Sequence, residues 1–537
     1  MRCRLLTVAF SLIVLTDLVL AWPVLAQSQA QPVLPTPPRT FLDTSYTPPS
    51  GRTIAVGAGG DLQAALRAAQ PGDVITLEPG AIFRGNFSLP KKAGSGWIII
   101  RSGAPDEKLP PPGTRVTRAF ASVMPKIESQ NSGPAVHTEP GAHHYRFIGV
   151  EFSAAPTVKT IYSIVAFGGD QVSDADTPYD LILDRCYVHG HPALMSSRGV
   201  LLNSASSAVI DSHVSEIHAE GYDSQAVLGY NGRGPFKIVN NFLEGAAENV
   251  MFGGADPRIP GLVPSDIEIR RNHLCKPLSW RPGDPSFAGA RWTVKNLFEL
   301  KNAQRVIVEG NLLENNWGGA AVVLTPRNQD GTAPWSIVQD VLFRNNIVKN
   351  SGSGFSLQTS DELRPSQPTK RIAVVNNLWI GLTTTFFGMT SGPPGALDDL
   401  LIDHNTAIPG GYSTFYIEAA RQPAINRFRL TNNLMGFGAF GVPTPDEAFF
   451  KFLPGAIVAR NALVNLADTA DGQGTARNRG YSQAFYSSFP NAVAAGLNAD
   501  GSLTAKSPNR RAGTDGKDVG VDFAELERSM APQTLPR

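Results

Sequence analysis

Leu342-Phe343-Arg344-Asn345-Asn346-Ile347 is one copy of a short phrase that keeps returning along this chain. In each copy an alternating apolar strand runs into asparagine and then another apolar residue, as in Lys237-Ile238-Val239-Asn240-Asn241-Phe242. The last asparagine of the phrase falls at positions 241, 272, 311, 346, 377, 405, 433 and 461, so the spacings are 31, 39, 35, 31, 28, 28 and 28 residues. A repeat near this length, made of short glycine-bounded strands, predicts an all-β right-handed parallel β-helix of about 10 to 12 coils.

Stacking the coils brings like residues to about 4.8 Å from one another. The marker asparagines can then hydrogen-bond along the stack as an internal ladder, which makes them structural residues. Cys186 and His213 hold the same place in two earlier copies. Asp403-His404 also lies inside a ladder copy, so it is interpreted as structural.

The start of the folded body is predicted to be a capping helix, because open strand edges recruit other chains. In Asp61 to Ala69, the apolar residues Leu62, Ala65, Leu66 and Ala69 share one face, and Asp61 is placed to cap the first turn. We expect the β-helix domain to run from residue 53 to 465, and residues 466–537 to form a C-terminal capping and tail region.

The amino terminus has the layout of a secretory signal peptide, with Arg2 and Arg4 before an apolar run and Ala26 at the expected cleavage position. The run from Leu5 to Ala26 is just long enough to span a bilayer, so an uncleaved anchor is the alternative. Residues 27–52 are rich in proline and are predicted to be an extended linker. We therefore expect a secreted or periplasmic protein that has no membrane segment after signal cleavage.

The charge balance and the cysteine count limit the kinds of ligand and cross-link to be expected. The net charge is +1, with 47 basic and 46 acidic residues, so nucleic acid is not expected as a ligand. Beyond the signal only Cys186 and Cys275 remain, too few for a disulfide framework, and the sequence leaves open whether they pair. We expect a monomer held together by packing.

Two phrases at the ends of the body carry a resemblance to a known family. Leu62-Gln-Ala-Ala-Leu66 followed by Pro71-Gly-Asp-Val-Ile75 resembles the opening of the pectate-lyase-like β-helix superfamily. Ser507-Pro508 and Gly513 to Gly520 are similar to a closing phrase of its bacterial members. The resemblance implies the fold for most of the chain and says little about the substrate.

Candidate site residues come from the strand that follows each marker. Aligning these strands stacks a row of apolar residues inward: Leu202, Leu228, Phe252, Phe298, Leu324 and Leu357. Strand alternation then places their polar neighbours on one outer patch. These are Lys295, Glu299, Lys301 and Arg327, with Gln225, Asn249 and Gln358 on adjoining coils and the aromatic residues Tyr230 and Trp317 beside them.

Such a patch suits an acidic polysaccharide. Uronate polymers are cleaved by β-elimination, in which a base removes the proton next to the carboxylate and an acid assists the leaving oxygen. Lys301 is the predicted base, Lys295 the rival base and Arg327 the carboxylate clamp or proton donor. Asn249 and Glu299 offer oxygen ligands for Ca²⁺, the candidate cofactor, while Tyr230 and Trp317 could stack on sugar rings.

This constellation resembles the chondroitinase B and alginate lyase family, whose β-helix enzymes use a lysine base, an arginine one coil on and, in many members, Ca²⁺ held by Asn and Glu. Lys301, Arg327, Asn249 and Glu299 match those places, although only one acidic ligand is found where two are usual. A glycoside hydrolase on the same fold and a noncatalytic glycan-binding β-helix are the alternative functions. A metal or acid-base site made by His189, His191, His218 and Glu220 is a further alternative that depends on how the coils align.

Overall fold

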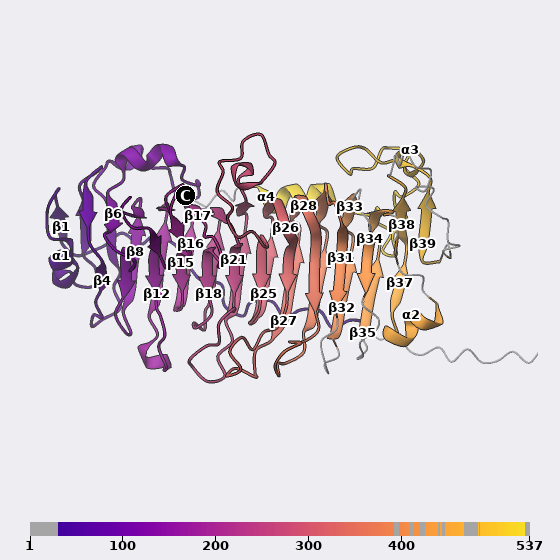
Figure 1. Cartoon of the computed structure of the whole chain (residues 1–537), viewed down its shortest axis with the longest axis horizontal. Helices are drawn as coiled ribbons and strands as arrows, with labels where there is room; N and C mark the ends of the chain where they lie inside the picture. Colours follow the sequence, from indigo (N-terminus) through magenta and orange to yellow (C-terminus); the bar gives the residue numbers. More distant parts are fainter. Residues whose placement is uncertain are drawn as a thin grey trace, which may run out of the picture.

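The computed structural model describes residues 31–390, 397–408, 413–417, 425–438, 441–442, 446–466, 482 and 484–531. The expected signal peptide, residues 1–26, lies outside these ranges. No helix of the described residues is long and apolar enough to cross a membrane. The strands lie side by side in one long row that begins at α1 and ends near β39 (Figure 1).

A complete coil contributes three strands, one to each of three parallel stacks. The first stack is a 14-stranded parallel sheet. Its strands are β1 (Thr53–Val56), β2 (Val74–Leu77), β5 (Ile98–Ser102), β8 (His143–Ile148), β12 (Tyr179–Asp184), β16 (Ala205–Ile210), β19 (Phe236–Val239), β22 (Ser265–Arg270), β25 (Ala303–Glu309), β27 (Val338–Arg344), β29 (Lys370–Val375), β32 (Leu397–Asp403), β35 (Ile425–Thr431) and β37 (Ile457–Ala459).

The second stack follows the turn after each of these strands. Its strands are β3 (Ile82–Arg84), β6 (Lys126–Ser129), β9 (Glu151–Ala154), β13 (Tyr187–His189), β17 (His213–Ile217), β20 (Phe242–Gly245), β23 (His273–Cys275), β26 (Leu312–Leu324), β28 (Ile347–Gln358), β30 (Leu378–Ile380), β33 (Thr406–Ile408), β36 (Leu434–Gly436), β38 (Asn461–Val464) and β39 (Tyr486–Phe489).

The third stack returns the chain toward the first. Its strands are β4 (Phe87–Leu89), β7 (Val136–Thr138), β11 (Val165–Phe167), β15 (Arg198–Leu202), β18 (Gln225–Gly229), β21 (Glu248–Phe252), β24 (Phe298–Leu300), the carboxyl-terminal parts of β26 and β28, β31 (Thr385–Thr390) and β34 (Ser413–Ile417). A short pair, β10 (Thr160–Ile161) and β14 (Met195–Ser196), lies beside it. In the described residues, eleven coils, which begin at β2 and end with the coil of β32, carry strands in all three stacks, so the predicted right-handed parallel β-helix and its length are confirmed.

The asparagine ladder forms as predicted. From Asn241 to Asn461 the Nδ2 of each marker donates to the Oδ1 of the next at 2.9 to 3.1 Å, and all the markers are buried. Cys186 holds the ladder place as expected, but Ser212 takes the place assigned to His213, since the Ser212 N–H donates to Asn241 Oδ1. His213 follows as the first residue of β17.

The ends are closed by helices. Asp61 caps α1 (Leu62–Ala68) by accepting from the Ala64 N–H at 2.9 Å, which confirms the predicted N-terminal cap. The remaining helices of the described residues are α2 (Glu447–Phe452), α3 (Ala492–Ala495) and α4 (Phe523–Met530), with the 3₁₀ turns η1 (Asp106–Lys108), η2 (Arg118–Val123), η3 (Asp174–Asp176) and η4 (Leu278–Trp280). The carboxyl-terminal chain does more than cap: it runs back along the coils, where Asn432, His404, Asn376 and Asn345 bond to residues between 514 and 529.

The proline-rich segment carries no helix or strand over residues 31–52, and it is docked on the body. We call residues 31–46 the proline strap. The backbone N–H groups of Val33, Thr36 and Arg39 donate to one Oδ1 each of Asp399, Asp340 and Asp266 at 2.8 to 2.9 Å. These aspartates stand in β32, β27 and β22, which are every second strand of the first stack.

The spacing has a simple physical origin. A polyproline II helix has three residues per turn and advances about 9.3 Å in that turn. Two neighbouring strands span about 9.6 Å. The strap therefore presents one N–H to every second coil, with Pro32, Pro35 and Pro38 turned toward the sheet.

Arginines on the coil that follows each strap aspartate complete a charge ladder. Arg305, Arg371 and Arg427 each bind the preceding aspartate through Nε and Nη2 at 2.5 to 3.0 Å. Burial alone would raise the pKa of Asp340, but the Arg371 guanidinium and the Thr36 N–H outweigh it and hold that pKa below its ordinary value. Each strap contact is thus a charge-assisted hydrogen bond.

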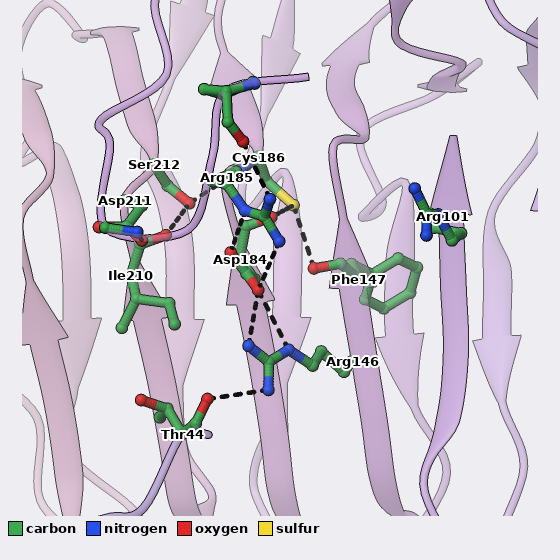
Figure 2. Close-up of polar contacts among 12 residues, drawn as sticks. Thr44, Arg101, Arg146, Phe147, Asp184, Arg185, Cys186, Ile210, Asp211 and Ser212 are labelled. Atoms are coloured by element: carbon green, nitrogen blue, oxygen red, sulfur yellow. Dashed lines mark hydrogen bonds and ion pairs between the residues drawn. The ribbon is translucent and has the colours of Figure 1, made fainter. Parts of the chain in front are cut away.

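At its other end the strap joins a buried ion cluster (Figure 2). Asp184 is fully buried and accepts from Arg146 at 2.6 Å and from Arg185 at 2.7 Å, while Arg146 also donates to the Thr44 carbonyl at 2.9 Å. The bonds and charges of the two arginines outweigh burial and lower the pKa of Asp184. The strap is therefore fixed at both ends of its path.

Candidate functional site

A groove of about 710 Å³ lies on the outer face of the third stack, over β15, β18 and β21. Its floor is apolar, because Leu201, Leu228 and Met251 form a small cluster outside the main core, against which Tyr230 packs. Tyr162 and Tyr222 stand at its side, with Tyr162 60% exposed. An apolar floor with exposed aromatic rings is a surface on which sugar rings can stack.

The floor differs from the predicted alignment at two positions. Leu228 pairs with Leu201 and faces outward, and Gly229 takes the inward place opposite Phe252. A side chain at Gly229 would meet the Phe252 ring at 2.8 Å, so the smallest residue is needed there. The second difference is that Phe298 pairs with Val322, and Leu300 is the residue opposite Leu324. Phe298 and Leu300 both face inward and are two residues apart, so the sequence pattern fits either of them.

Arg198, which was not among the predicted site residues, lines the groove. Within the part of the chain that the structure describes, its side chain has no carboxylate partner, and its Nε is buried without a hydrogen-bond partner. Most other arginines of the coil faces are bound to aspartate or glutamate. An unpaired guanidinium beside aromatic rings is suited to bind a ligand carboxylate in a bidentate way.

Two of the predicted residues line the same groove. Gln225 lies directly beside Arg198 on the next coil and donates from Nε2 to Glu248 at 2.8 Å. Tyr230 donates from its hydroxyl to Asp170 at 3.2 Å, and burial together with the Asp170 charge raises the pKa of this phenol. Gln225 and Tyr230 therefore lie together on the lining of this groove.

The predicted lysines are not among the residues that line the groove, and each stands beside a carboxylate. Lys295 Nζ is 2.6 Å from Asp223, which lines the groove, and this bond outweighs burial and raises the pKa of Lys295. Lys301 Nζ is 3.7 Å from Glu299. The stem of Lys301 passes Gly253 and Gly254, where a Cβ on Gly253 would come within 2.9 Å of Lys301 Cβ.

Glu248, the first residue of β21, was not among the predicted site residues. It is fully buried, its Oε1 has no hydrogen-bond partner, and Gln225 is bound to its Oε2. Burial and the charges of Glu299 and Asp223 raise the pKa of Glu248 to about 8. This carboxyl group therefore holds its proton at neutral pH, a state in which a carboxylic acid can donate.

Asn249 is turned away from the groove. It is fully buried, and its Nδ2 donates to the carbonyls of Leu243 and Cys275 while its Oδ1 accepts from Lys276 Nζ at 3.1 Å. The physical reason is the register, since Gln225 pairs with Glu248 and so Glu248 takes the outer place that the alignment gave to Asn249. An amide oxygen already bound to an ammonium group does not fit a Ca²⁺ ligand.

The buried Lys276 cross-links the chain segments around Asn249. Its ammonium donates to the carbonyls of Gly245 and Asn296 at 2.8 Å each, as well as to Asn249, so three chain segments meet at one buried atom. Burial lowers the pKa of Lys276 to about 7, against the opposing charge of Glu248. Lys276 thus holds the segment that carries Lys295 against the edge of the groove.

The remaining predicted residues are more distant. The Arg327 N–H donates to the Lys301 carbonyl, so the two residues are on adjoining coils as expected, but the Arg327 guanidinium is bound to Asp361 at 2.9 Å and Glu362 at 3.2 Å. Gln358 ends β28 and donates to Glu362. Trp317 lies at the bulge in β26 and does not line the groove.

The histidine alternative is not assembled. His189 is bound to Glu151 at 2.9 Å on the second stack, whereas His218 is buried between Trp280 and Trp292, with ring centroids 3.9 Å from Trp292. The two tryptophans belong to the long insert that follows β23, so His218 anchors that insert to the coil.

No family model and no curated protein matches the chain. Among solved structures, a mannuronic acid specific polysaccharide family 6 lyase from human gut microbiota aligns at 11% identity, with 82% of this chain and 92% of that chain covered and a TM-score of 0.42. An alginate lyase from Paenibacillus sp. aligns at 14% identity, with 68% and 98% covered and a TM-score of 0.33.

A GH87 α-1,3-glucanase from Streptomyces thermodiastaticus also aligns, at 11% identity, with 84% of this chain and 69% of that chain covered and a TM-score of 0.42. Lyases and hydrolases thus resemble the chain to a similar degree, and these likenesses do not choose between them. The coils themselves show that the chain is a right-handed parallel β-helix.

Proposed function

We propose that the protein is a polysaccharide lyase that binds a uronate-containing glycan in the third-stack groove and cleaves it by β-elimination. The observation that carries the proposal is Arg198, an unpaired guanidinium in a groove with tyrosine walls and an apolar floor. The rings and floor suit the apolar faces of sugars, and the guanidinium suits a carboxylate. The location predicted from the amino terminus, secreted or periplasmic, would give the protein access to such a polymer.

In this reaction a base takes the proton from the carbon next to the sugar carboxylate. The electron pair of that bond forms a carbon–carbon double bond, and the glycosidic carbon–oxygen bond at the next carbon breaks. The leaving oxygen then takes a proton from an acid. Neutralising the substrate carboxylate lowers the energy of the charge that develops beside it.

Lys301 remains the proposed base, and the groove assigns new parts to its neighbours. Lys295 is bound to Asp223 and has a raised pKa, which suits a proton donor better than a rival base. Arg327 is already bound by two carboxylates. Arg198 stands three coils from Lys301 and is therefore proposed to bind the carboxylate of another sugar unit of the polymer. The predicted Ca²⁺ site at Asn249 and Glu299 is not part of this proposal, because the Asn249 amide oxygen is bound to Lys276. Calcium dependence of the activity stays a prediction.

The test is a panel of uronate polymers with absorbance of unsaturated product ends as the readout. We expect activity in the wild type and a loss of about 10²- to 10⁴-fold in Lys301→Ala, the usual contribution of a general base. Arg327→Ala is the matched control on the adjoining coil and is expected to retain activity. Unchanged cleavage by Lys301→Ala would remove this residue from the mechanism, and an added chelator tests the calcium prediction in the same assay.

A glycoside hydrolase is the second candidate, and Glu248 favours it. A hydrolase needs one protonated and one ionised carboxyl group, and Glu248, with a pKa of about 8, has Glu299 and Asp223 as charged neighbours. New reducing ends without unsaturated ends, lost in Glu248→Gln and retained in Lys301→Ala, would select this function. Saturable binding without turnover would select the noncatalytic alternative.

A further inference from the structure

A second cluster of ligand-type side chains lies on the outer face of the second stack, away from the groove. His273 and Cys275 are two residues apart in β23, so strand alternation puts them on one face. Glu314 in β26 pairs directly with Cys275 on the next coil. The ligand atoms of His273, Cys275 and Glu314 all lie within 4.8 Å of one another.

The neighbours of the cluster hold these side chains in place. Glu314 points one oxygen at His273 Nε2, 2.8 Å away, and the other at Lys349 Nζ, 3.0 Å away. The His273 ring packs edge-on against Phe242 at 5.0 Å between centroids. Ligating carboxylates are commonly hydrogen-bonded on their outer oxygen in this way, so Lys349 can orient Glu314 without occupying the side that faces the cluster.

Cys275 makes the cluster more than a histidine and carboxylate pair. Its Sγ lies among them, and the amide of Asn315 approaches it only at 3.9 Å. The thiol is buried while His273 and Glu314 are partly exposed, so the cluster can be reached from solvent on the side of His273 and Glu314. Imidazole, thiolate and carboxylate are the three ligand types that bind Zn²⁺ and similar ions in proteins.

We propose that His273 Nε2, Cys275 Sγ and a Glu314 carboxylate oxygen bind one divalent transition metal ion of the zinc type. On binding, the thiol loses its proton to solvent, and the bond between His273 and Glu314 is replaced by two bonds to the ion. Water occupies the fourth position, because the described residues bring three ligands together. The ion links β23 to β26, at the start of the long insert that leads to Lys295, and it is independent of the glycan chemistry proposed above.

The test is a Co²⁺ titration of the metal-free full chain carrying Cys3→Ser, followed by near-ultraviolet absorbance. Thiolate ligation gives an intense charge-transfer band, and we expect it to saturate at one ion per chain. Zn²⁺ should displace Co²⁺ and abolish the band. Cys275→Ser should abolish the band, and Lys349→Met should weaken binding about 10- to 100-fold, as loss of an outer partner does.

Cys186→Ser is the matched control, since Cys186 is the other cysteine of the folded body and is fully buried in the ladder. It should leave the band and the affinity unchanged. Glu314→Gln provides a second ligand variant, and the melting curve of each metal-free variant confirms that it is folded. A wild type without the charge-transfer band, or a band that survives in folded Cys275→Ser, overturns the proposal.

Discussion

The outer face of the first stack and the groove of the third stack both carry many polar and charged side chains, yet they treat charge in opposite ways. On the first stack Asp266, Asp340 and Asp399 are each bound by an arginine and by a strap N–H. In the groove Arg198 has no carboxylate partner in the described chain. The fully buried Glu248, which is bound to the groove residue Gln225, keeps one oxygen without a hydrogen bond. Paired charges suit a structural face, and uncompensated ones suit a site that awaits a ligand.

The difference also shows in what covers each face. The proline strap lies across the first stack. Its carbonyl groups accept hydrogen bonds from Arg146 and Lys237, and its N–H groups donate to the aspartates of the first stack. The groove is left open, with an apolar floor and exposed tyrosines. Substitutions on the first face should therefore change stability and leave glycan chemistry alone, and those in the groove should do the reverse.

The largest stability effect is expected for Asp184→Asn. It leaves Arg146 and Arg185 buried without their shared carboxylate, and breaking such a buried pair costs about 3–5 kcal/mol. Urea unfolding at pH 7 measures the loss, with Asp284→Asn in an exposed turn as the control. A loss below about 1 kcal/mol would contradict a structural role for this cluster.

The same carboxylate sets a pH dependence. Because the folded pKa of Asp184 is below its ordinary value, its contribution is present above about pH 3.9 and is lost as the pH falls through the lowered folded value. The unfolding free energy of the wild type should fall in this acid range. In Asp184→Asn the fall should be smaller.

Glu248→Gln is expected to stabilise the protein in alkaline solution. Because the pKa of Glu248 is raised to about 8 in the folded protein, its contribution to stability is full below the ordinary pKa of about 4.3 and falls until the pH has passed about 8, where the folded chain buries a charge. The variant should match the wild type at pH 5 and exceed it at pH 9 by about 1–3 kcal/mol, the cost of a buried uncompensated group. Glu107→Gln, on an exposed turn, should show no such crossover, and its absence in Glu248→Gln would mean that Glu248 is not buried as a neutral acid.

Thr36→Pro isolates one strap contact. Proline keeps the polyproline II conformation between Pro35 and Pro37 but removes the N–H that binds Asp340. A hydrogen bond to a charged acceptor contributes about 1.5–3 kcal/mol, and proline returns about 0.4–1 kcal/mol by restricting the unfolded chain. We expect a net loss of about 1–2 kcal/mol by thermal or urea unfolding, whereas Thr36→Ala, which keeps the N–H, should lose less than about 0.5 kcal/mol.

Arg198→Met should have the smallest effect on stability and a large effect on binding. The side chain makes no ion pair in the described structure, so unfolding should change by no more than about 0.5 kcal/mol. Affinity for a uronate oligosaccharide, measured by calorimetry, should fall at least about tenfold, which corresponds to about 1.4 kcal/mol. Arg305→Met on the first stack is the inverse control, expected to lose stability and keep affinity.

Much of the fold could be read from local patterns. The marker asparagines, the capping helix after Asp61 and the near-constant repeat all depend on residues close in sequence, so their outcome was predictable. Which residues of the third stack face inward was harder to predict. The inward place at Gly229 is left small because the Phe252 ring of the next coil fills that space, and Phe298 and Leu300 fit the same alternating pattern. Those differences moved Asn249 inside and brought Glu248 to the site.

The strap shows the same limit from another side. Pro32, Pro35 and Pro38 recur every three residues, a signal for polyproline II that the sequence displays openly. The sequence does not show that Asp266, Asp340 and Asp399 stand on alternate strands. The loops between these strands differ in length, so the spacing of the aspartates in the sequence does not reveal their spacing in the sheet. The match of a three-residue turn to two coils exists only once the coils are stacked.

By itself the sequence determined the coil, its ladder and its first cap, since these follow from hydrogen bonding and alternation within and between repeats of similar length. Only the tertiary structure decided which charges are neutralised. Arg305 finds Asp266 and Arg198 finds no carboxylate, although nothing in either local sequence distinguishes the two arginines. The physical reason is that the partners of a side chain on a β-helix stand one coil away, and a shift of one or two residues in any intervening loop changes which side chains meet.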